Sequence, residues 1–311
     1  MNKKIVLLDA RGGALGDEIC IEPIARYVIS MGLYDVRILS GYPQVFKHLN
    51  CPIGLVQGDI TSNDEKYTYI PACPRHMSNT GIFMEHPFAS FAQPLLCHPV
   101  DFVSLFMLRR MLPDKDKRPI LTYSQEAVNE LTKLNALSID VAFHIGATEK
   151  CRAFPQAYTQ KIVDDLETLG IKVAIFGKTT RYTPEVRCNI DLVDKLDLDM
   201  LFAFIAISPI VLTNDSAPIH IAAAFNTYLL VVPTIRHPDR LLHVRNGSRY
   251  HNTRVLFKKL MFDDLNLPLE NIVGDRKWSD VENRREEFLP EPHTVLKNLE
   301  EIMTYLQFTA V

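Results

Sequence analysis

Residues 210–225 read Ile-Val-Leu-Thr-Asn-Asp-Ser-Ala-Pro-Ile-His-Ile-Ala-Ala-Ala-Phe and carry the strongest signal for the fold. The apolar run 210–213 is typical of a strand that is buried on both faces of a parallel sheet. Residues 217–225 form a predicted helix, and Pro218 suits its first turn. Because backbone amides at a helix start attract anions, the Asn-Asp-Ser segment between strand and helix predicts a phosphate site.

The same alternation of strand and helix patterns runs through the second half of the chain. Further strands are predicted at 139–143, 172–176 and 228–232, and further helices at 158–169 and 199–207. Parallel strands that are joined by helices make a doubly wound sheet, in which ligands gather at the carboxyl ends of the strands.

The first half of the chain opens with a similar pattern. Its predicted strands are 5–8, 36–39, 54–56 and 67–70, and its predicted helices are 18–31, 100–111 and 124–134. We therefore expect an α/β protein with two Rossmann-like doubly wound domains facing a cleft. The expected domains are 1–136 and 137–292, and the last segment, 293–311, is a helix that packs back towards the N-terminal domain.

Composition excludes several classes of protein. The 311 residues are 47% hydrophobic and 23% charged, which is typical of globular proteins and not of disordered or fibrous chains. The longest apolar run, 201–212, contains Ser208 and Pro209 and is too short for a membrane span. The opening apolar stretch is also too short for a secretory signal, so we expect a cytoplasmic protein. Six cysteines without a Cys-x-x-Cys pair indicate reduced thiols and predict no metal site.

A glycine-bearing loop follows the first predicted strand and contains Gly12, Gly13 and Gly16. Its spacing matches neither the Gly-x-Gly-x-x-Gly dinucleotide fingerprint nor a P-loop, which disfavours a nucleotide-dependent oxidoreductase. Asp17 comes directly after this loop. It is interpreted either as a cap of the following helix or as a general base.

A second polar loop, 144–155, follows the strand at 139–143. Thr148 and the loop amides are suited to binding phosphate oxygens, and Lys150 or Arg152 is suited to neutralising their charge. The alternative is a solvated loop with ordinary surface charges. In the 210–225 stretch, Asp215 is available for sugar hydroxyls and His220 for a phosphate, or they are a cap and a packing residue.

Three segments resemble the heptosyltransferase-like enzymes of glycosyltransferase family nine, which have the GT-B fold. They are GGALGDEICIEPIARYV near the N-terminus, HIGATEKCRAFPQAY in the middle and TNDSAPIHIAAAFNT after it. The first is similar to the family's Gly-x-Leu-Gly-Asp segment and the second to its His-x-Gly-Ala…Lys-x-Trp-Pro segment. The third is similar to its Thr-Asn-Asp-Ser-Gly-x-x-His segment.

The resemblance implies an inverting glycosyltransferase. Such an enzyme moves a sugar from a nucleotide diphosphate donor to an acceptor hydroxyl without a required metal or other cofactor. By position, Asp17 resembles the catalytic base, and the N-terminal domain is the acceptor side. The resemblance places the nucleotide sugar on the second domain, with these donor residues: Thr148, Lys150, Arg152, Glu185 for the ribose hydroxyls, Asn214, Asp215, Ser216, Ala217 and His220. Two positions differ from the family pattern, because Arg152 precedes Ala-Phe-Pro and Ala217 replaces the glycine.

A basic stretch between residues 236 and 259 has seven Lys and Arg residues against the single acid Asp239, in a chain of net charge -3. We expect Arg236, Arg240, Arg245 and Arg249 to form a patch for an anionic acceptor. The first choice is a saccharide of the lipopolysaccharide core, in a bacterium. The alternative is a hydroxymethylated base of viral DNA, in a bacterial host.

Two other classes of protein keep the same diphosphate site. A nucleotide-sugar epimerase of this fold consumes the donor with no acceptor. A binding module without catalysis does not depend on Asp17. For the glycosyltransferase, the expected partners are the nucleotide sugar and the anionic acceptor. We expect no integral membrane segment.

Overall fold

The computed structural model describes residues 4–11, 14–54, 67–71, 98–233, 238–258 and 286–309. For Lys4, residues 67–71, Phe102, Phe106, Met107, Arg240 and Thr309 it describes the backbone course alone. The chain divides into two compact units. The first unit is Met1–Thr122, Ala223–Phe225 and Asp239–His251, and the second is Tyr123–Ala222, Asn226–Pro238 and Asn252–Val311. The predicted boundary at residue 137 therefore lies within the second unit of this division.

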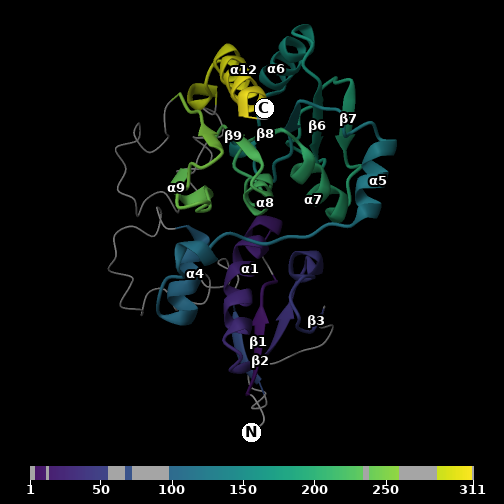
Figure 1. Ribbon diagram of the computed structural model, residues 1–311. Coiled ribbons are helices and arrows are strands. Elements are labelled where there is room, and N and C mark those ends of the chain that lie inside the picture. The colour runs from purple at the N-terminus through teal and green to yellow at the C-terminus, as the bar shows by residue number, and fades with distance from the viewer. Residues whose placement is uncertain are drawn as a thin grey trace. The chain divides into compact units, whose positions relative to one another are not determined.

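The first unit contains a parallel sheet with the strand order β3-β2-β1-β4 (Figure 1). Its strands are β1 (Lys4–Asp9), β2 (Tyr34–Leu39), β3 (Ile53–Gly54) and β4 (Tyr67–Pro71). Its helices are α1 (Leu15–Ser30) and α4 (Pro99–Leu108), with short 3-10 turns η1 (Pro43–Phe46) and η3 (Asp114–Asp116). The central strand β1 pairs with β2 in parallel, with Val6 opposite Val36. Both valines are buried, as expected for a sheet with a continuous apolar core.

Two buried glutamates of α1 hold this unit together. Glu18 accepts hydrogen bonds from the Ser40 hydroxyl and from the Gly41 backbone N–H at 2.8 Å, which joins α1 to the end of β2. Burial raises the pKa of Glu18, and these hydrogen bonds partly offset the rise. Glu22 accepts from Arg26 at 2.8 Å and from the Ile120 backbone N–H at 2.9 Å. Both carboxylates are therefore structural crosslinks of the unit.

The second unit contains a six-stranded parallel sheet with the order β10-β9-β8-β5-β6-β7. Its strands are β5 (Val141–His144), β6 (Val173–Gly177), β7 (Ile190–Val193), β8 (Ile210–Thr213), β9 (Tyr228–Val231) and β10 (Thr253–Val255). Its helices are α5 (Gln125–Lys133), α6 (Gln156–Thr168), α7 (Leu198–Ile207) and α12 (Pro292–Thr309), with the 3-10 turn η4 (Lys150–Arg152). Residues of α8 (Pro218–Phe225) and α9 (Pro238–Leu241) occur in both units.

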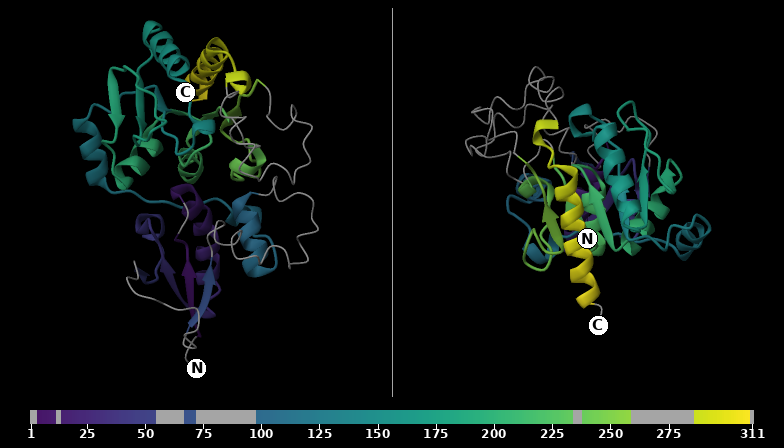
Figure 2. Two further views of the ribbon diagram at one scale, coloured as in Figure 1. Left: turned by 180° about the vertical axis from the view of Figure 1, so that it is seen from behind. Right: turned by 90° about the horizontal axis from the view of Figure 1, so that it is seen from above.

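The second sheet is covered by helices on both faces. Alternate strand residues such as Phe143 and Leu212 pack into one core with Ile162 of α6 and Leu299 of α12. Figure 2 shows α6 and α12 next to each other. On the opposite face Phe176 of β6 packs edge-on against a ring of α7. This is the doubly wound α/β architecture predicted from the sequence.

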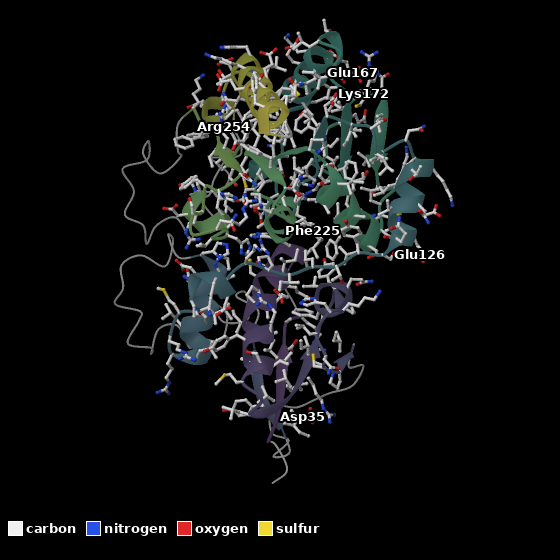
Figure 3. All side chains as sticks on the ribbon, viewed as in Figure 1. Asp35, Glu126, Glu167, Lys172, Phe225 and Arg254 are labelled. Carbon is white, nitrogen blue, oxygen red and sulfur yellow. The ribbon has the colours of Figure 1, made fainter. Side chains whose placement is uncertain are left out.

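Helix α12 belongs to this core. The sequence predicts that the last helix packs back towards the N-terminal domain, but its apolar side chains Val295, Leu299 and Ile302 lie in the core of the second unit. Arg254 of β10, labelled in Figure 3, donates to Asn298 at 2.9 Å and to Glu301 at 2.6 Å. These contacts attach α12 to the edge strand of its own sheet.

None of the described helices combines the length and the apolar character needed to cross a membrane.

Two glycines bring the loops after β5 and β6 into close contact. A Cβ atom at Gly177 would lie 2.9 Å from the backbone N of Gly146, and Gly177 has a φ of 143°. A Cβ at Gly146 would in turn lie 3.0 Å from Nε2 of His144. The two loops can therefore meet at this distance because neither residue has a side chain.

We expect Gly177→Ala to destabilise the second unit by more than about 2 kcal/mol, since the substitution combines a clash with an unfavourable φ. Gly170→Ala is the matched control, because Gly170 also has a positive φ, 75°, but has no atom near the added Cβ. Urea unfolding of both variants measures the difference. Equal losses of stability would contradict the close contact of the two loops.

Candidate functional site at the carboxyl edge of the second sheet

The order of strands in the second sheet reverses between β5 and β8. From β5 the chain continues to β6 and β7 on one side, and then crosses to β8, β9 and β10 on the other. At such a reversal the connections leave the two neighbouring strands in opposite directions. This leaves a crevice at the carboxyl edge of a parallel sheet, where ligands bind. The loops that follow β5 and β8 are the two polar loops in which the sequence predicts a phosphate site.

Asn214 joins these two loops. Its side chain is fully buried, and its amide Nδ2 donates to the backbone carbonyl of Arg152 at 2.7 Å and of Gly146 at 3.3 Å. Asn214 was predicted to bind the donor, and the structure shows that its amide positions the loop after β5. A ligand at this edge would therefore contact a loop whose backbone is fixed by the Asn214 amide.

Arg152 makes the reciprocal connection. Its Nη1 donates to the carbonyl of Asp215 at 3.1 Å, and its Nη2 donates to the hydroxyl of Thr148 at 2.7 Å. Its Nε forms an ion pair with Glu149 at 3.0 Å, and only 12% of the side chain is exposed. A guanidinium has five N–H groups in a planar fork, so this one is oriented and still has N–H groups for an anion. Lys150 lies in the same short turn and is half-buried.

The residues after β8 lead directly into α8. Asp215 is buried, and its carbonyl accepts from Arg152, while Ser216 and Ala217 are half-buried. Helix α8 begins at Pro218, and the N–H of His220 donates to the carbonyl of Ala217 at 3.0 Å. The amides of Ser216 and Ala217 therefore lie just before a helix start, where the helix dipole favours negative charge.

His144 is buried at the end of β5. Its Nδ1 lies 3.3 Å from the hydroxyl of Thr213, at the end of the neighbouring strand β8. Burial lowers the pKa of His144 to about 4, and the positive charge of Arg152 acts in the same direction. The imidazole is therefore neutral at pH 7. The sequence shows His144 within a motif, but it gives no sign that this ring lies between the two strands at the switch point.

The loop after β6 completes this edge of the sheet. The hydroxyl of Thr180 donates to the carbonyl of Ala147 at 2.6 Å, which attaches this loop to the one after β5. Glu185 lies further along and is exposed. Thr180 was not predicted from the sequence, since a threonine in an irregular loop has no pattern that marks it.

In the first unit, Asp17 caps α1. Its Oδ2 accepts a hydrogen bond from the backbone N–H of Ala14 at 2.9 Å, and its side chain is half-buried. Gly16 is buried in the first turn of α1, and Gly12 and Gly13 lie outside the described residues. The predicted cap is therefore present. Because Glu18 and Glu22 are fully buried, Asp17 is the most accessible carboxylate of this helix.

The structure describes the side chains of two of the four arginines in the predicted basic patch. Arg245 is 2% exposed, and burial lowers its pKa to about 10. Arg249 donates to the carbonyl of Leu242 at 2.6 Å and pairs with Asp101 at 2.9 Å. Arg236 and the side chain of Arg240 lie outside the described residues. Sequence position alone could not distinguish a buried arginine from an exposed one.

A known protein family matches the part of the chain that contains this edge of the sheet. Residues 101–240 match the model of glycosyltransferase family 9 (heptosyltransferase). The resemblance predicted from the sequence is confirmed, and so is the class of enzyme, a glycosyltransferase. The family 9 match includes the loops after β5 and β8 and ends before the basic stretch is complete; it does not include Asp17.

Solved structures of glycosyltransferases share the fold at low sequence identity. A family 9 glycosyltransferase from Veillonella parvula is 14% identical with a TM-score of 0.63, and the match covers 98% of each chain. The Escherichia coli ADP-heptose lipopolysaccharide heptosyltransferase II is 15% identical with a TM-score of 0.53, covering 98% of this chain and 99% of that one. The predicted GT-B fold is confirmed by these neighbours. No curated protein sequence matches the chain.

A third similar structure is TibC, described as a dodecameric iron-containing heptosyltransferase in complex with ADP-D-β-D-heptose. It is 12% identical with a TM-score of 0.58, and the match covers 96% of this chain and 76% of that one. A second TibC structure names enterotoxigenic E. coli as its source.

The low pKa of His144 predicts a loss of stability in acid. The unfolded chain takes up a proton near pH 6.5, whereas the folded chain resists protonation until about pH 4, so stability falls as the pH drops through this window. We expect the free energy of unfolding to lose about 2 kcal/mol between pH 7.5 and 5 through this group. Urea unfolding of the wild type and of His144→Gln across that range measures it; parallel pH profiles would contradict the prediction.

Proposed function

We propose that the chain transfers a heptose-type sugar from a nucleoside diphosphate donor, ADP-heptose first, to a hydroxyl of an anionic acceptor. The observation that carries the proposal is the oriented guanidinium of Arg152 beside the carbonyl of Asp215, at the switch point of the second sheet. A diphosphate at this edge would receive N–H groups from Arg152 and from the start of α8. The heptosyltransferase names of similar structures favour ADP-heptose as the donor.

We assign the donor side to residues of the second unit. Arg152 is the cation that neutralises the leaving diphosphate, since its fork is already oriented by three polar contacts. Thr148, Lys150, Asp215 and His220 are further donor contacts, with the amides of Ser216 and Ala217. Glu185 stays a proposed contact of the ribose hydroxyls. A fixed cation and fixed amides stabilise charge as it develops, which is the role a divalent ion has in other transferases; we therefore propose that catalysis requires no metal.

We assign the base to Asp17. Deprotonation of the acceptor hydroxyl by a carboxylate permits direct displacement of the diphosphate and hence inversion at the anomeric carbon. The two neighbouring carboxylates of α1 are engaged by buried hydrogen bonds, which leaves Asp17 as the accessible candidate on this helix.

For the acceptor we propose a saccharide of the lipopolysaccharide core type. The name of a similar structure, a lipopolysaccharide heptosyltransferase, favours this acceptor. Incubation of the enzyme and ADP-heptose with core saccharide and with DNA that contains hydroxymethylcytosine separates the two acceptors, and NMR of the product reports the anomeric configuration. Transfer to DNA would support the alternative acceptor. Conversion of the donor sugar without any acceptor would indicate an epimerase.

We expect Arg152→Lys to weaken ADP binding about 10- to 100-fold, because lysine cannot reproduce a bidentate contact with diphosphate. Calorimetry with ADP and with adenosine separates this effect from a general disturbance of the site: the ADP affinity falls and the adenosine affinity does not. Arg187→Lys is the matched control, since Arg187 is exposed in the same unit. An unchanged ADP affinity would remove Arg152 from the donor site.

We expect Asp17→Asn to lower kcat at least about 100-fold with little change in donor KM, since asparagine cannot accept a proton. Asparagine can still accept the hydrogen bond from Ala14, so the cap of α1 and the melting temperature should be preserved. Asp35→Asn serves as the control, because Asp35 is a half-exposed aspartate of the same unit that pairs with Arg37 at 3.5 Å. Turnover at the wild-type rate would exclude Asp17 as the base.

A further inference from the structure

Three metal-ligating side chains meet inside the first unit. Cys20 lies in α1, His98 directly precedes α4, and His243 lies two residues after α9. The Sγ of Cys20 is 3.9 Å from Nε2 of His243. The rings of His98 and His243 have centroids 4.3 Å apart at an angle of 64°. One ligand atom of each residue lies within 4.8 Å of those of the other two.

These distances are close to those of a metal site. Zinc–sulfur and zinc–nitrogen bonds of about 2.3 and 2.0 Å at a tetrahedral centre place the ligand atoms about 3.3–3.6 Å apart. The cluster needs only a small contraction to reach that geometry. All three side chains are buried, with exposures of 1% for Cys20 and 2% for each histidine. One thiolate and two imidazoles are a ligand set that suits a borderline divalent ion better than Mg²⁺ or Ca²⁺.

We propose that Cys20, His98 and His243 bind one divalent transition-metal ion of the Zn²⁺ or Fe²⁺ class. On binding, the Cys20 thiol releases its proton to solvent and the thiolate forms the metal–sulfur bond. The two imidazoles bind as neutral ligands. Three protein ligands leave at least one further coordination position, for water or for another side chain.

The ion would connect segments that are distant in the chain. Cys20 belongs to α1, and α1 packs against α4, whose first residue follows His98. His243 brings in the segment 239–251, which is attached to the same unit by the ion pair of Arg249 with Asp101. A metal bound by ligands from three such segments restrains their relative positions and so stabilises the folded unit.

The alternative is a packed cluster in which the thiol and the imidazoles make hydrogen bonds alone. His98 Nδ1 accepts a hydrogen bond from the Val100 backbone N–H at 3.2 Å, which places the ring proton on Nε2. Coordination through Nε2 moves that proton to Nδ1 and breaks this cap of α4. The loss of one cap is small beside the gain from a full metal–ligand set, so the contact does not exclude a metal.

The test uses the whole 311-residue chain without a polyhistidine tag. Metal content of the purified chain is measured by mass spectrometry, before and after incubation with excess Zn²⁺ and desalting. We expect about one ion per chain, the loss of that ion in Cys20→Ser and its retention in Cys51→Ser. Cys51 is the matched control, because it is a free cysteine of the same unit and burial raises the pKa of its thiol to about 11. Either zinc or iron, lost with Cys20, supports the proposal.

A spectroscopic measurement guards against a variant that fails to fold. Co²⁺ added to the metal-free wild type should give a thiolate-to-cobalt charge-transfer band, which is absent from His243→Gln and from Cys20→Ser if both keep the wild-type circular dichroism. X-ray absorption of the Zn²⁺ form should show one sulfur ligand among nitrogen ligands. No retained metal, no charge-transfer band in the folded wild type, or binding that survives in Cys20→Ser would overturn the proposal. Donor binding is measured separately by calorimetry, so failure here leaves the proposed transferase activity untouched.

Discussion

The second unit depends on two reciprocal contacts between the loops that follow β5 and β8. A parallel sheet brings the ends of its strands to one edge, but the hydrogen-bond ladder stops there and leaves the loops without support. The amide of Asn214 donates to the backbone of Arg152, and the guanidinium of Arg152 donates to the backbone of Asp215. Both side chains are largely shielded from water, where such bonds are stronger. The shape of this edge of the sheet follows from this pair.

The first unit uses acidic side chains in a comparable way. Helix α1 has three carboxylates within six residues, and two of them, Glu18 and Glu22, are buried and bind backbone N–H groups from other segments. A buried carboxylate with several donors is costly to remove, because its partners would then be left unsatisfied. Asp17, in contrast, is half-buried and caps α1 through the backbone N–H of Ala14. Two of the three carboxylates of this helix therefore join it to other segments, and the third lies at its N-terminus.

The sequence predicts much of the fold because buried parallel strands are continuous apolar runs. β5, β6, β8 and β9 were all predicted close to their observed bounds, whereas β7 and β10 were missed. These two are the edge strands, and each is short with a charged residue inside, Asp191 or Arg254, so no apolar run marks it. The polar loops after β5 and β8 could be predicted because each directly follows one of these apolar runs. Burial of Arg245 and the meeting of Cys20 with His98 and His243 depend on tertiary contacts, which a local pattern does not contain.

The first unit is discontinuous along the chain. Its segment 239–251 follows five of the six strands of the second sheet in the sequence. Within this segment Arg249 pairs with Asp101, and His243 lies next to Cys20. Contacts over such separations form late and slow the folding of a chain. During synthesis, the contacts of the first unit therefore stay incomplete until residues 239–251 have emerged from the ribosome. A fragment that ends near residue 122 would expose the surface of α1 and α4 that this late segment covers.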